Sequence, residues 1–323
     1  MERPLAKIIG LGSCVPKKVV TNDDLAKFVD TSDEWIVSRT GIKERRVSEY
    51  SESTSDLAYP AAKEAIENAK ISPEDIDLII VATTSPDTLF PSTACILQDR
   101  LGAKKAAAFD VSAACSGFNF SLSVASNFIA AGTYKIILVV GADTLTKYLD
   151  WKDRTTCVLF GDGAGAAVLK ASTDGSGIIS NYIMSNGFER NALTMPGGGS
   201  RDPEERNGRF IKMDGKEVFK FAVKALEDTV IRSLSIAGLS PKDITLLIPH
   251  QANIRIIDHA IKKLVLPKES VYVNLERYGN TSAASIPLAL TEAYKSGRLK
   301  KGDIVVLAGF GAGLTAGANV IKW

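Results

Sequence analysis

The chain has 323 residues, and its 39 Lys and Arg side chains nearly balance its 37 Asp and Glu side chains. A hydrophobic fraction of 45% and a charged fraction of 24% are typical of a folded globular protein, which excludes disordered and fibrous classes. A net charge of +2 gives no support to a nucleic-acid binder, because such a domain is usually strongly basic.

No segment of the sequence suggests export or membrane insertion. The first residues, MERPLAK, lack the apolar stretch of a secretory signal, and the most apolar run, residues 136–140, is far shorter than a membrane span. We therefore expect a soluble cytoplasmic protein with no membrane partner. The four cysteines form no C-x-x-C pair, and the two histidines lie nine residues apart, so neither disulfides nor a metal site is expected.

Apolar strand-like runs alternate with helix-like segments along the chain. Helices are predicted at residues 61–70, 116–131 and 254–264, and strands at residues 76–83, 106–111, 136–142, 246–249 and 304–308. Strands that alternate with helices indicate an α/β fold, in which helices cover a mostly parallel sheet.

The second half of the chain repeats the first. Residues 72–80 (SPEDIDLII) match residues 240–248 (SPKDITLLI), an offset of 168, and the strand at Ile136 recurs at Ile304 with the same offset. Farther on, residues 164–170 match residues 316–322 with an offset of 152, so the first half carries about 16 extra residues after Asp143. The sequence thus predicts two similar halves, residues 1–172 and 173–323, and the insert is expected to form a functional surface loop.

Cys115 lies where a predicted strand gives way to a helix through the small residues Ser-Ala-Ala. The positive end of a helix dipole favours a thiolate, so this position suits a nucleophile, although a lone cysteine is more often a buried structural residue. Cys14, Cys95 and Cys157 lack this setting and are read as structural.

Two further residues follow strands in the second half. His250 comes directly after the apolar run 246–249, and Asn280 lies in the loop YGNTSAAS, which the offset of 168 makes the counterpart of the cysteine loop. Taken singly, these residues fit a structural histidine and a turn. Because ligand sites lie at the carboxyl ends of parallel strands, Cys115, His250 and Asn280 together indicate a nucleophile, a proton or hydrogen-bond partner and an anion stabiliser.

Glycine-rich stretches at residues 161–165 and 309–313 miss the spacing of a dinucleotide or phosphate loop. Their glycines are expected instead to let the backbone approach a substrate and direct an N–H group at it.

At this level of detail the sequence resembles the β-ketoacyl-acyl carrier protein synthase III family of thiolase-fold condensing enzymes. The resemblance covers nearly the whole chain and rests on residues 31–36 (TSDEWI), 39–42 (RTGI), 113–115 (AAC), 160–165 (FGDGAG), 249–253 (PHQAN) and 279–285 (GNTSAAS). It implies a five-layered αβαβα fold with two duplicated halves around a pseudo-twofold axis, a homodimer, and a Cys115–His250–Asn280 triad.

The resemblance also assigns the remaining site residues. It implies an oxyanion hole made by the N–H groups of Cys115 and Gly311, and an acyl pocket lined by Phe310 and, across the dimer interface, by Phe90. Coenzyme A is expected to contact Thr31, Trp35, Arg39, Arg154 and Asn253. An acyl carrier protein is expected to contact Gln251, Ala252, Asn253, Ile254, Arg255, Lys220, Lys262 and Lys263. Lys216 and residues 314–316 (LTA) depart from the residues usual in the family.

The activity implied is the initiating condensation of fatty acid synthesis. Cys115 takes an acyl group from acyl-CoA, expected to be acetyl-CoA, and malonyl-acyl carrier protein then loses carbon dioxide and attacks that acyl group. No cofactor is expected, because coenzyme A and pantetheine arrive on the substrates. One alternative is another thiolase-fold condensing enzyme, for instance a secondary-metabolite ketosynthase or a hydroxymethylglutaryl-CoA synthase-like protein. The others are a non-catalytic carrier-binding paralogue and a cysteine hydrolase.

Overall fold

The computed structural model describes residues 3–323. Within this range nine strands form the main sheet, in the order β11-β12-β13-β8-β1-β7-β6-β4-β5. These strands are β1 (Leu5–Cys14), β4 (Leu78–Ala82), β5 (Ala107–Val111), β6 (Ile136–Asp143), β7 (Gly163–Ser172), β8 (Gly177–Ser185), β11 (Leu246–Pro249), β12 (Ile304–Gly311) and β13 (Thr315–Lys322).

The sheet is two half-sheets that meet at one point. A single residue pair, Ala6 with Ile178, joins β1 to β8, and away from that pair the two half-sheets diverge. In each half the strands that run parallel, β4 with β6 and β11 with β12, are followed by an antiparallel neighbour. Nearly continuous apolar runs such as β4 are buried along their whole length, as expected for strands covered on both faces.

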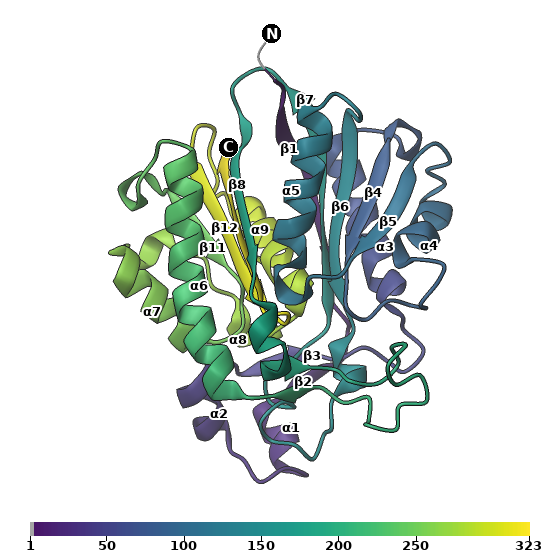
Figure 1. Cartoon of the computed structure of the whole chain (residues 1–323), viewed down its shortest axis with the longest axis vertical. Coiled ribbons are helices and arrows are strands. Elements are labelled where there is room, and N and C mark those ends of the chain that lie inside the picture. The colour runs from purple at the N-terminus through teal and green to yellow at the C-terminus, as the bar shows by residue number, and fades with distance from the viewer. Residues whose placement is uncertain (1–2) are drawn as a thin grey trace.

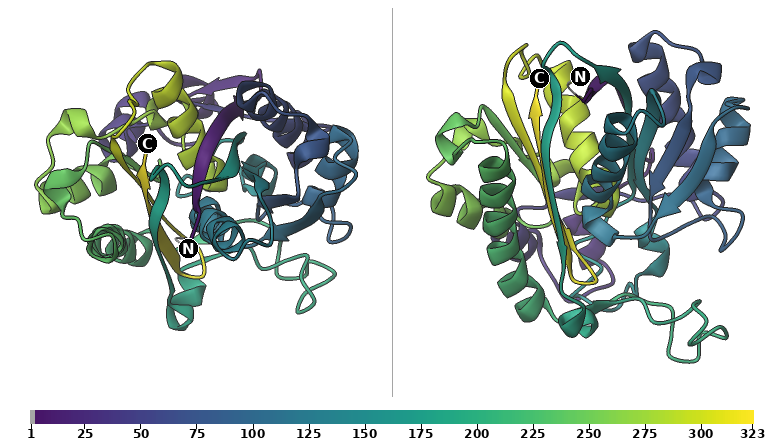
Figure 2. Two further views of the ribbon diagram at one scale, coloured as in Figure 1. Left: turned by 90° about the horizontal axis from the view of Figure 1, so that it is seen from above. Right: turned by 45° about the horizontal axis from the view of Figure 1, so that its top comes forward.

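Helices form three layers around the half-sheets (Figures 1 and 2). Helices α5 (Gly117–Ala130) and α9 (Ser285–Lys295) lie between the half-sheets and contact strands of both. Helices α3 (Thr54–Ala69) and α4 (Thr93–Leu101) cover one outer face, and α6 (Gly215–Ile236) and α7 (Ile254–Leu264) cover the other. The layer order is therefore αβαβα, which confirms the predicted fold class.

The repeat seen in the sequence recurs as structure. Two short helical turns, the cysteine turn (Ala114–Ser116) and the opposite turn (Ser282–Ala284), stand 168 residues apart, and each leads into a central helix, α5 or α9. Serine caps begin equivalent turns at Ser72 and Ser240. The boundary between residues 172 and 173 itself stays a prediction, although β7 ends at Ser172.

The predicted elements are largely confirmed, with one clear error. Helix α3 begins at Thr54 rather than at residue 61, because a capping box between Ser53 and Asp56 starts it and Pro60 is tolerated within it. The prediction of residues 61–70 rests on the spacing of apolar residues, which does not report a capping box.

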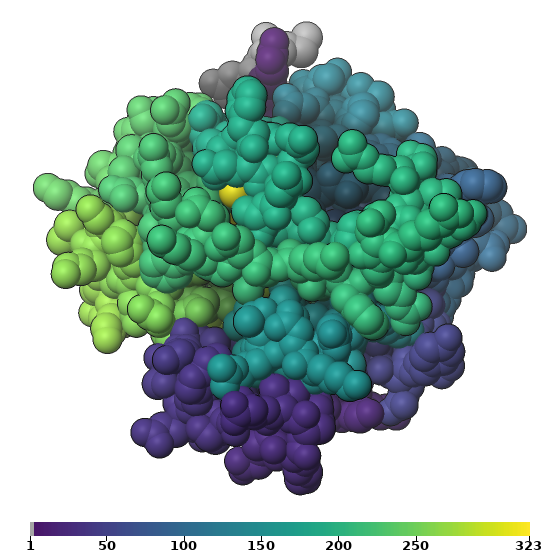
Figure 3. Space-filling view, turned by 60° about the horizontal axis from the view of Figure 1, so that its bottom comes forward, coloured from purple at the N-terminus to yellow at the C-terminus, as the bar shows by residue number. Residues whose placement is uncertain are grey.

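Smaller elements gather at one end of the half-sheets, seen at the bottom of Figure 1. They are β2 (Val19–Thr21), β3 (Glu44–Arg46), α1 (Asn22–Ala26), α2 (Asp33–Thr40), α8 (Leu275–Tyr278), β9 (Leu193–Thr194) and β10 (Lys212–Met213). The insert lies here as well: residues 144–162 join β6 to β7, whereas residues 312–314 join β12 to β13. In the space-filling view of this end, the N-terminal segment (purple), the insert (teal) and the β9–β10 region (green) adjoin one another (Figure 3).

No helix among the described residues is long and apolar enough to cross a bilayer.

Candidate active site

The cysteine turn and the opposite turn meet where the two halves face each other. Ala114 and Ser282, which are equivalent by the offset of 168, both adopt left-handed backbone conformations, with φ of 45° and 51°. Such a conformation costs a residue with a Cβ roughly 1–3 kcal/mol and is concentrated at functional sites. In the cysteine turn, the left-handed conformation of Ala114 makes the sharp bend that places Cys115 just before α5.

Cys115, His250 and Asn280 line one cavity of about 90 Å³. Cys115 also lines a larger cavity of about 260 Å³, whose walls are mostly apolar. The residues common to both cavities are Cys115, Phe160 and Leu193. Cys115 therefore lies where the cavity that holds His250 and Asn280 adjoins a larger cavity with room for an acyl chain.

His250 follows β11 and is only 1% exposed. Its Nδ1 lies 2.6 Å from Ser285 Oγ, and its ring packs edge-on against Phe310 with centroids 5.1 Å apart. Because Nδ1 is occupied by Ser285, Nε2 is the ring nitrogen available to the cavity. Burial lowers the pKa of the imidazole to about 3, so the ring is neutral near pH 7.

Asn280 is held by both its backbone and its side chain. The backbone N–H donates to Leu159 and the carbonyl accepts from Gly161, which ties the loop to the first half. The side-chain Oδ1 accepts the backbone N–H of Ser282 at 2.8 Å, which assigns the amide orientation and leaves Nδ2 as a donor toward the cavity. The preceding Gly279 has a φ of +64°, and a Cβ there would lie 2.7 Å from the Leu159 oxygen.

The environment of Cys115 contradicts the expected direction of its pKa. The thiol is 5% exposed, and its burial raises the pKa to about 12 rather than lowering it. Loss of solvent around a sulfur enclosed by mostly apolar groups outweighs what the helix end supplies. The resting nucleophile is thus a neutral thiol beside a neutral imidazole.

Gly311, at the end of β12, lies against the backbone N–H of Cys115. A Cβ at position 311 would come within 2.6 Å of that nitrogen and 3.1 Å of the Cys115 Cβ. Only glycine leaves room next to the N–H group, and this is the space that an oxyanion held by Cys115 and Gly311 would need.

Comparisons with known proteins agree with this geometry. Residues 109–187 match the family model for 3-oxoacyl-[acyl-carrier-protein (ACP)] synthase III, and residues 234–323 match the model for the C-terminal part of the same family. A β-ketoacyl-[acyl-carrier-protein] synthase III from Caldanaerobacter subterraneus is 55% identical over 327 residues, covering 100% of this chain and 99% of the relative. The chain belongs to the β-ketoacyl-[acyl-carrier-protein] synthase III family.

Solved structures of synthase III proteins have the same fold. The 3-oxoacyl-[acyl-carrier-protein] synthase III of Aquifex aeolicus superposes with a TM-score of 0.94 at 49% identity, covering 98% of this chain and 100% of that one. The priming β-ketosynthase of the R1128 polyketide pathway also reaches a TM-score of 0.94, at 36% identity over 99% of this chain and 96% of that one.

The residues that the synthase III resemblance assigned to coenzyme A fall into two groups. Trp35 on α2 has the guanidinium carbons of Arg39 and Arg154 at 4.5 and 4.9 Å from its ring centre, and Arg154 also donates to the Asp30 carbonyl at 2.7 Å. A flat ring could stack between Trp35 and Arg154 only after Arg154 moves. Thr31 Oγ1 is buried and has no hydrogen-bond partner among the described residues. Asn253 lies apart from this cluster and lines the smaller cavity, beside the triad.

The two aromatic residues predicted for the acyl pocket are placed differently. Phe310 is 3% exposed and lines the smaller cavity. Phe90 is 86% exposed and lines neither cavity of its own chain. Its role in a pocket therefore depends on a second subunit.

One residue predicted to contact the carrier protein is misplaced. Gln251 is 1% exposed, and its side chain bonds to the carbonyls of Pro249 and Tyr272 and to the N–H of Asn274. Its carboxamide therefore fixes the interior below α7 and cannot meet a partner at the surface. The other predicted contacts are fully or partly exposed on or beside α6 and α7: Ala252, Asn253, Ile254, Arg255, Lys220, Lys262 and Lys263.

Sequence reasoning missed several residues of the site. Leu193, Met195 and Ile211 from the β9–β10 region form walls of the larger cavity, and no local pattern marks them. Ser285 could have been found, because it stands at the start of the helix that follows the Asn280 loop. Asp143 could also have been found, since adding 168 to its number gives Gly311.

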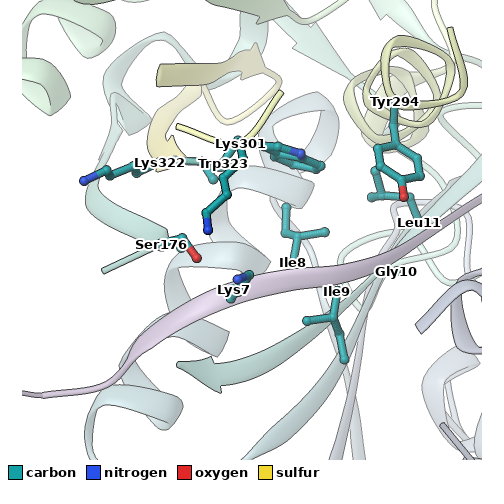
Figure 4. Close-up of a pocket in the computed structure, with 12 residues that line it drawn as sticks. Lys7, Ile8, Ile9, Gly10, Leu11, Ser176, Tyr294, Lys301, Lys322 and Trp323 are labelled. Carbon is teal, nitrogen blue, oxygen red and sulfur yellow. The ribbon is translucent and has the colours of Figure 1, made fainter. Parts of the chain in front are cut away.

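A cavity of about 400 Å³ lies apart from the site, near the junction of the half-sheets (Figure 4). Lys7, Tyr294, Lys301 and Trp323 are among its lining residues, and none of the predicted site residues is. Over residues 3–323, no group of three His, Cys, Asp or Glu side chains is arranged to hold a metal ion.

Proposed function

We propose that this chain catalyses the initiating condensation of fatty acid synthesis. Cys115 takes the acyl group of an acyl-CoA, and the acyl-enzyme then condenses with malonyl-acyl carrier protein to give β-ketoacyl-acyl carrier protein and carbon dioxide. This proposal rests on the position of Cys115, which lines both the cavity that holds His250 and Asn280 and the larger cavity.

The first half-reaction transfers the acyl group. The Cys115 sulfur attacks the thioester carbonyl, a C–S bond forms, and the oxyanion is held by the N–H groups of Cys115 and Gly311. Because burial raises the pKa of the Cys115 thiol to about 12, the thiol keeps its proton until the new C–S bond forms. The proton then passes to the departing coenzyme A thiolate, so the acyl-enzyme forms with no net proton gain.

The second half-reaction uses the smaller cavity, which His250 and Asn280 line. His250 Nε2 and Asn280 Nδ2 donate to the thioester oxygen of the malonyl group, on which enolate charge develops as the C–C bond to carbon dioxide breaks. The carbanion attacks the acyl carbonyl, and Cys115 leaves as the thiolate, which takes up one proton from the solvent. Each donor aimed at such a charge is worth about 3–4 kcal/mol of barrier. The residues need no cofactor for these steps, and we propose that none is used.

A homodimer is part of the proposal. Strand β5 is a short strand at the edge of the sheet. Phe90 is exposed and lies in the segment that continues from Thr84, a residue that lines the larger cavity. In a dimer, Phe90 of each chain would close the acyl cavity of the other. Sedimentation equilibrium with wild type and Phe90→Ala tests this. A monomeric wild type would refute it.

Acyl-CoA and acyl carrier protein are proposed to bind over neighbouring surfaces, because α2 and α7 are in contact. The Trp35–Arg39–Arg154 cluster would hold the nucleotide end of coenzyme A. The exposed basic residues Arg255, Lys262 and Lys263 on α7 and Lys220 on α6 would meet an acidic carrier protein. We further propose that the enzyme acts in the cytoplasm.

The test of the function is release of carbon dioxide from malonyl-acyl carrier protein that depends on acyl-CoA, with Cys115→Ala as control. A β-ketoacyl product from the wild type only is expected. Steady coenzyme A release without malonyl substrate would instead indicate a hydrolase. A panel of acyl-CoA lengths separates fatty acid initiation from the priming of another pathway, because a cavity of about 260 Å³ has room beyond an acetyl group.

A further inference from the structure

At the active site, one strand of each half ends against the turn of the other half, and each such meeting is here called a crossing. Strand β12 ends at Gly311 against the cysteine turn, and β6 ends at Asp143 against the opposite turn. Gly311 and Asp143 are equivalent by the offset of 168, and so are Cys115 and Ala283. The two crossings therefore have the same backbone plan but different side chains.

The difference lies in what occupies the space beside the turn. At the first crossing Gly311 leaves the N–H group of Cys115 open. At the second, Asp143 is 0% exposed and its Oδ2 accepts the N–H of Ala283 at 3.2 Å. A fixed carboxylate thus occupies, on one half, the place that the reaction oxyanion would occupy on the other.

The second oxygen of Asp143 is also fully used. Oδ1 accepts from the N–H groups of Thr84 and Ser85 at 2.9 and 3.2 Å, and from the hydroxyls of Thr83, Thr84 and Ser85. No Lys, Arg or His pairs with this carboxylate within residues 3–323; its charge is balanced by N–H and O–H donors alone. A buried charge held this way is expensive to remove, because every donor would lose its acceptor.

Through these bonds Asp143 connects two parts of the site. The opposite turn carries Ser282, whose N–H holds Asn280 Oδ1, so the carboxylate fixes the turn that orients the catalytic amide. Residues 83–85 include Thr84, a wall of the acyl cavity, and lead toward Phe90. The Asp143 carboxylate also affects the nucleophile. Burial is the main cause that raises the pKa of Cys115, and the nearby negative charge of Asp143 raises this pKa further.

We propose that Asp143 is a positioning residue for the condensation, an internal anion that holds the Asn280 turn and the acyl-cavity segment in register. This proposal rests on the proposed function, but the placement of Asp143 can be tested without either substrate. The groups that face Cys115 and can carry charge are His250, from the end of β11, and Asp143, from the end of β6.

The test compares Asp143→Asn with Asp77→Asn. Asp77 accepts the N–H groups of Lys135 and Ile136 at the opposite end of β6, so its loss controls for weakening of the same strand. In Asp143→Asn the amide cannot accept from both Ala283 and residues 84–85, since one side would place N–H against N–H. We expect malonyl decarboxylation to fall at least tenfold, and alkylation of Cys115 by iodoacetamide to rise at lower pH than in the wild type.

The variant Asp143→Glu distinguishes the effect of the negative charge from the effect of its position. It also provides the test if Asp143→Asn does not fold. It keeps the negative charge but displaces it, so decarboxylation should fall while the alkylation profile does not move to lower pH. The proposal would be overturned if both Asp143 variants decarboxylated malonyl substrate at the wild-type rate and kept the wild-type pH profile of alkylation. Losses in Asp77→Asn equal to those in Asp143→Asn would also overturn it. A wild type that decarboxylates nothing would refute the proposed function instead, and the alkylation profiles would still decide the placement of Asp143.

Discussion

Gly311→Ala tests the oxyanion hole directly, because it adds one methyl group where the charge should form. That Cβ would lie 2.6 Å from the Cys115 nitrogen, 3.1 Å from the Cys115 Cβ and 3.2 Å from the Ala114 Cβ. Carbon and nitrogen do not pack at 2.6 Å, so either the methyl group covers the N–H or the cysteine turn moves. Both outcomes remove one donor from the oxyanion, and loss of such a donor lowers a rate about 10²–10³-fold.

The assay is the rate at which acyl-CoA adds one acyl mass to the protein, followed by rapid quench and intact mass spectrometry. Overpacking should also destabilise the fold by about 1–3 kcal/mol, so the melting temperature is measured alongside. Gly187→Ala is the matched control, since no atom lies within 4 Å of the added Cβ and its backbone is not left-handed. A folded Gly311→Ala protein that acylates at the wild-type rate would refute the oxyanion assignment.

Three further predictions concern the triad and the carrier surface. His250→Ala and Asn280→Ala should still acylate Cys115 but lose malonyl decarboxylation about 10²–10⁴-fold; poor acylation with normal decarboxylation in Asn280→Ala would reverse its assigned role. Because burial raises the pKa of Cys115 to about 12, iodoacetamide alkylation should rise about tenfold per pH unit up to pH 10, whereas a plateau near pH 9 would indicate an ordinary thiol. Arg255→Glu should raise KM for the carrier protein, most at low salt, while the exposed control Lys170→Glu should not; equal KM values would remove Arg255 from that surface.

Much of the fold follows from local patterns and from the repeat. The α7 boundaries, residues 254–264, follow from apolar residues at helical spacing, and Ile256, Ile257, Ala260 and Leu264 are buried together. The offset of 168 in the sequence pairs the Cys115 loop with the Asn280 loop, and in the structure these two loops meet. The predicted start of α3 at residue 61 is wrong because the capping box of Ser53 and Asp56 starts the helix earlier, and the spacing of apolar residues does not report a cap.

The parts of the site that escaped prediction depend on three-dimensional enclosure. The pKa of Cys115 was expected to fall because its position at a helix start can be read from sequence, whereas the loss of solvent around the sulfur cannot. Gln251 lies within a motif at the head of α7, but its side chain turns inward to three backbone partners. The walls supplied by Leu193, Met195 and Ile211 come from an irregular segment with no periodic signature.

A single-turnover mass measurement tests the central claim most directly. The protein is exposed to acyl-CoA, its mass is recorded, and malonyl-acyl carrier protein is then added. We predict one acyl group per chain, located on Cys115 by peptide mapping, which disappears as β-ketoacyl-carrier product and carbon dioxide appear. An acyl group on another residue, or an acyl-Cys115 that malonyl-carrier protein does not discharge, would contradict a site built around this sulfur.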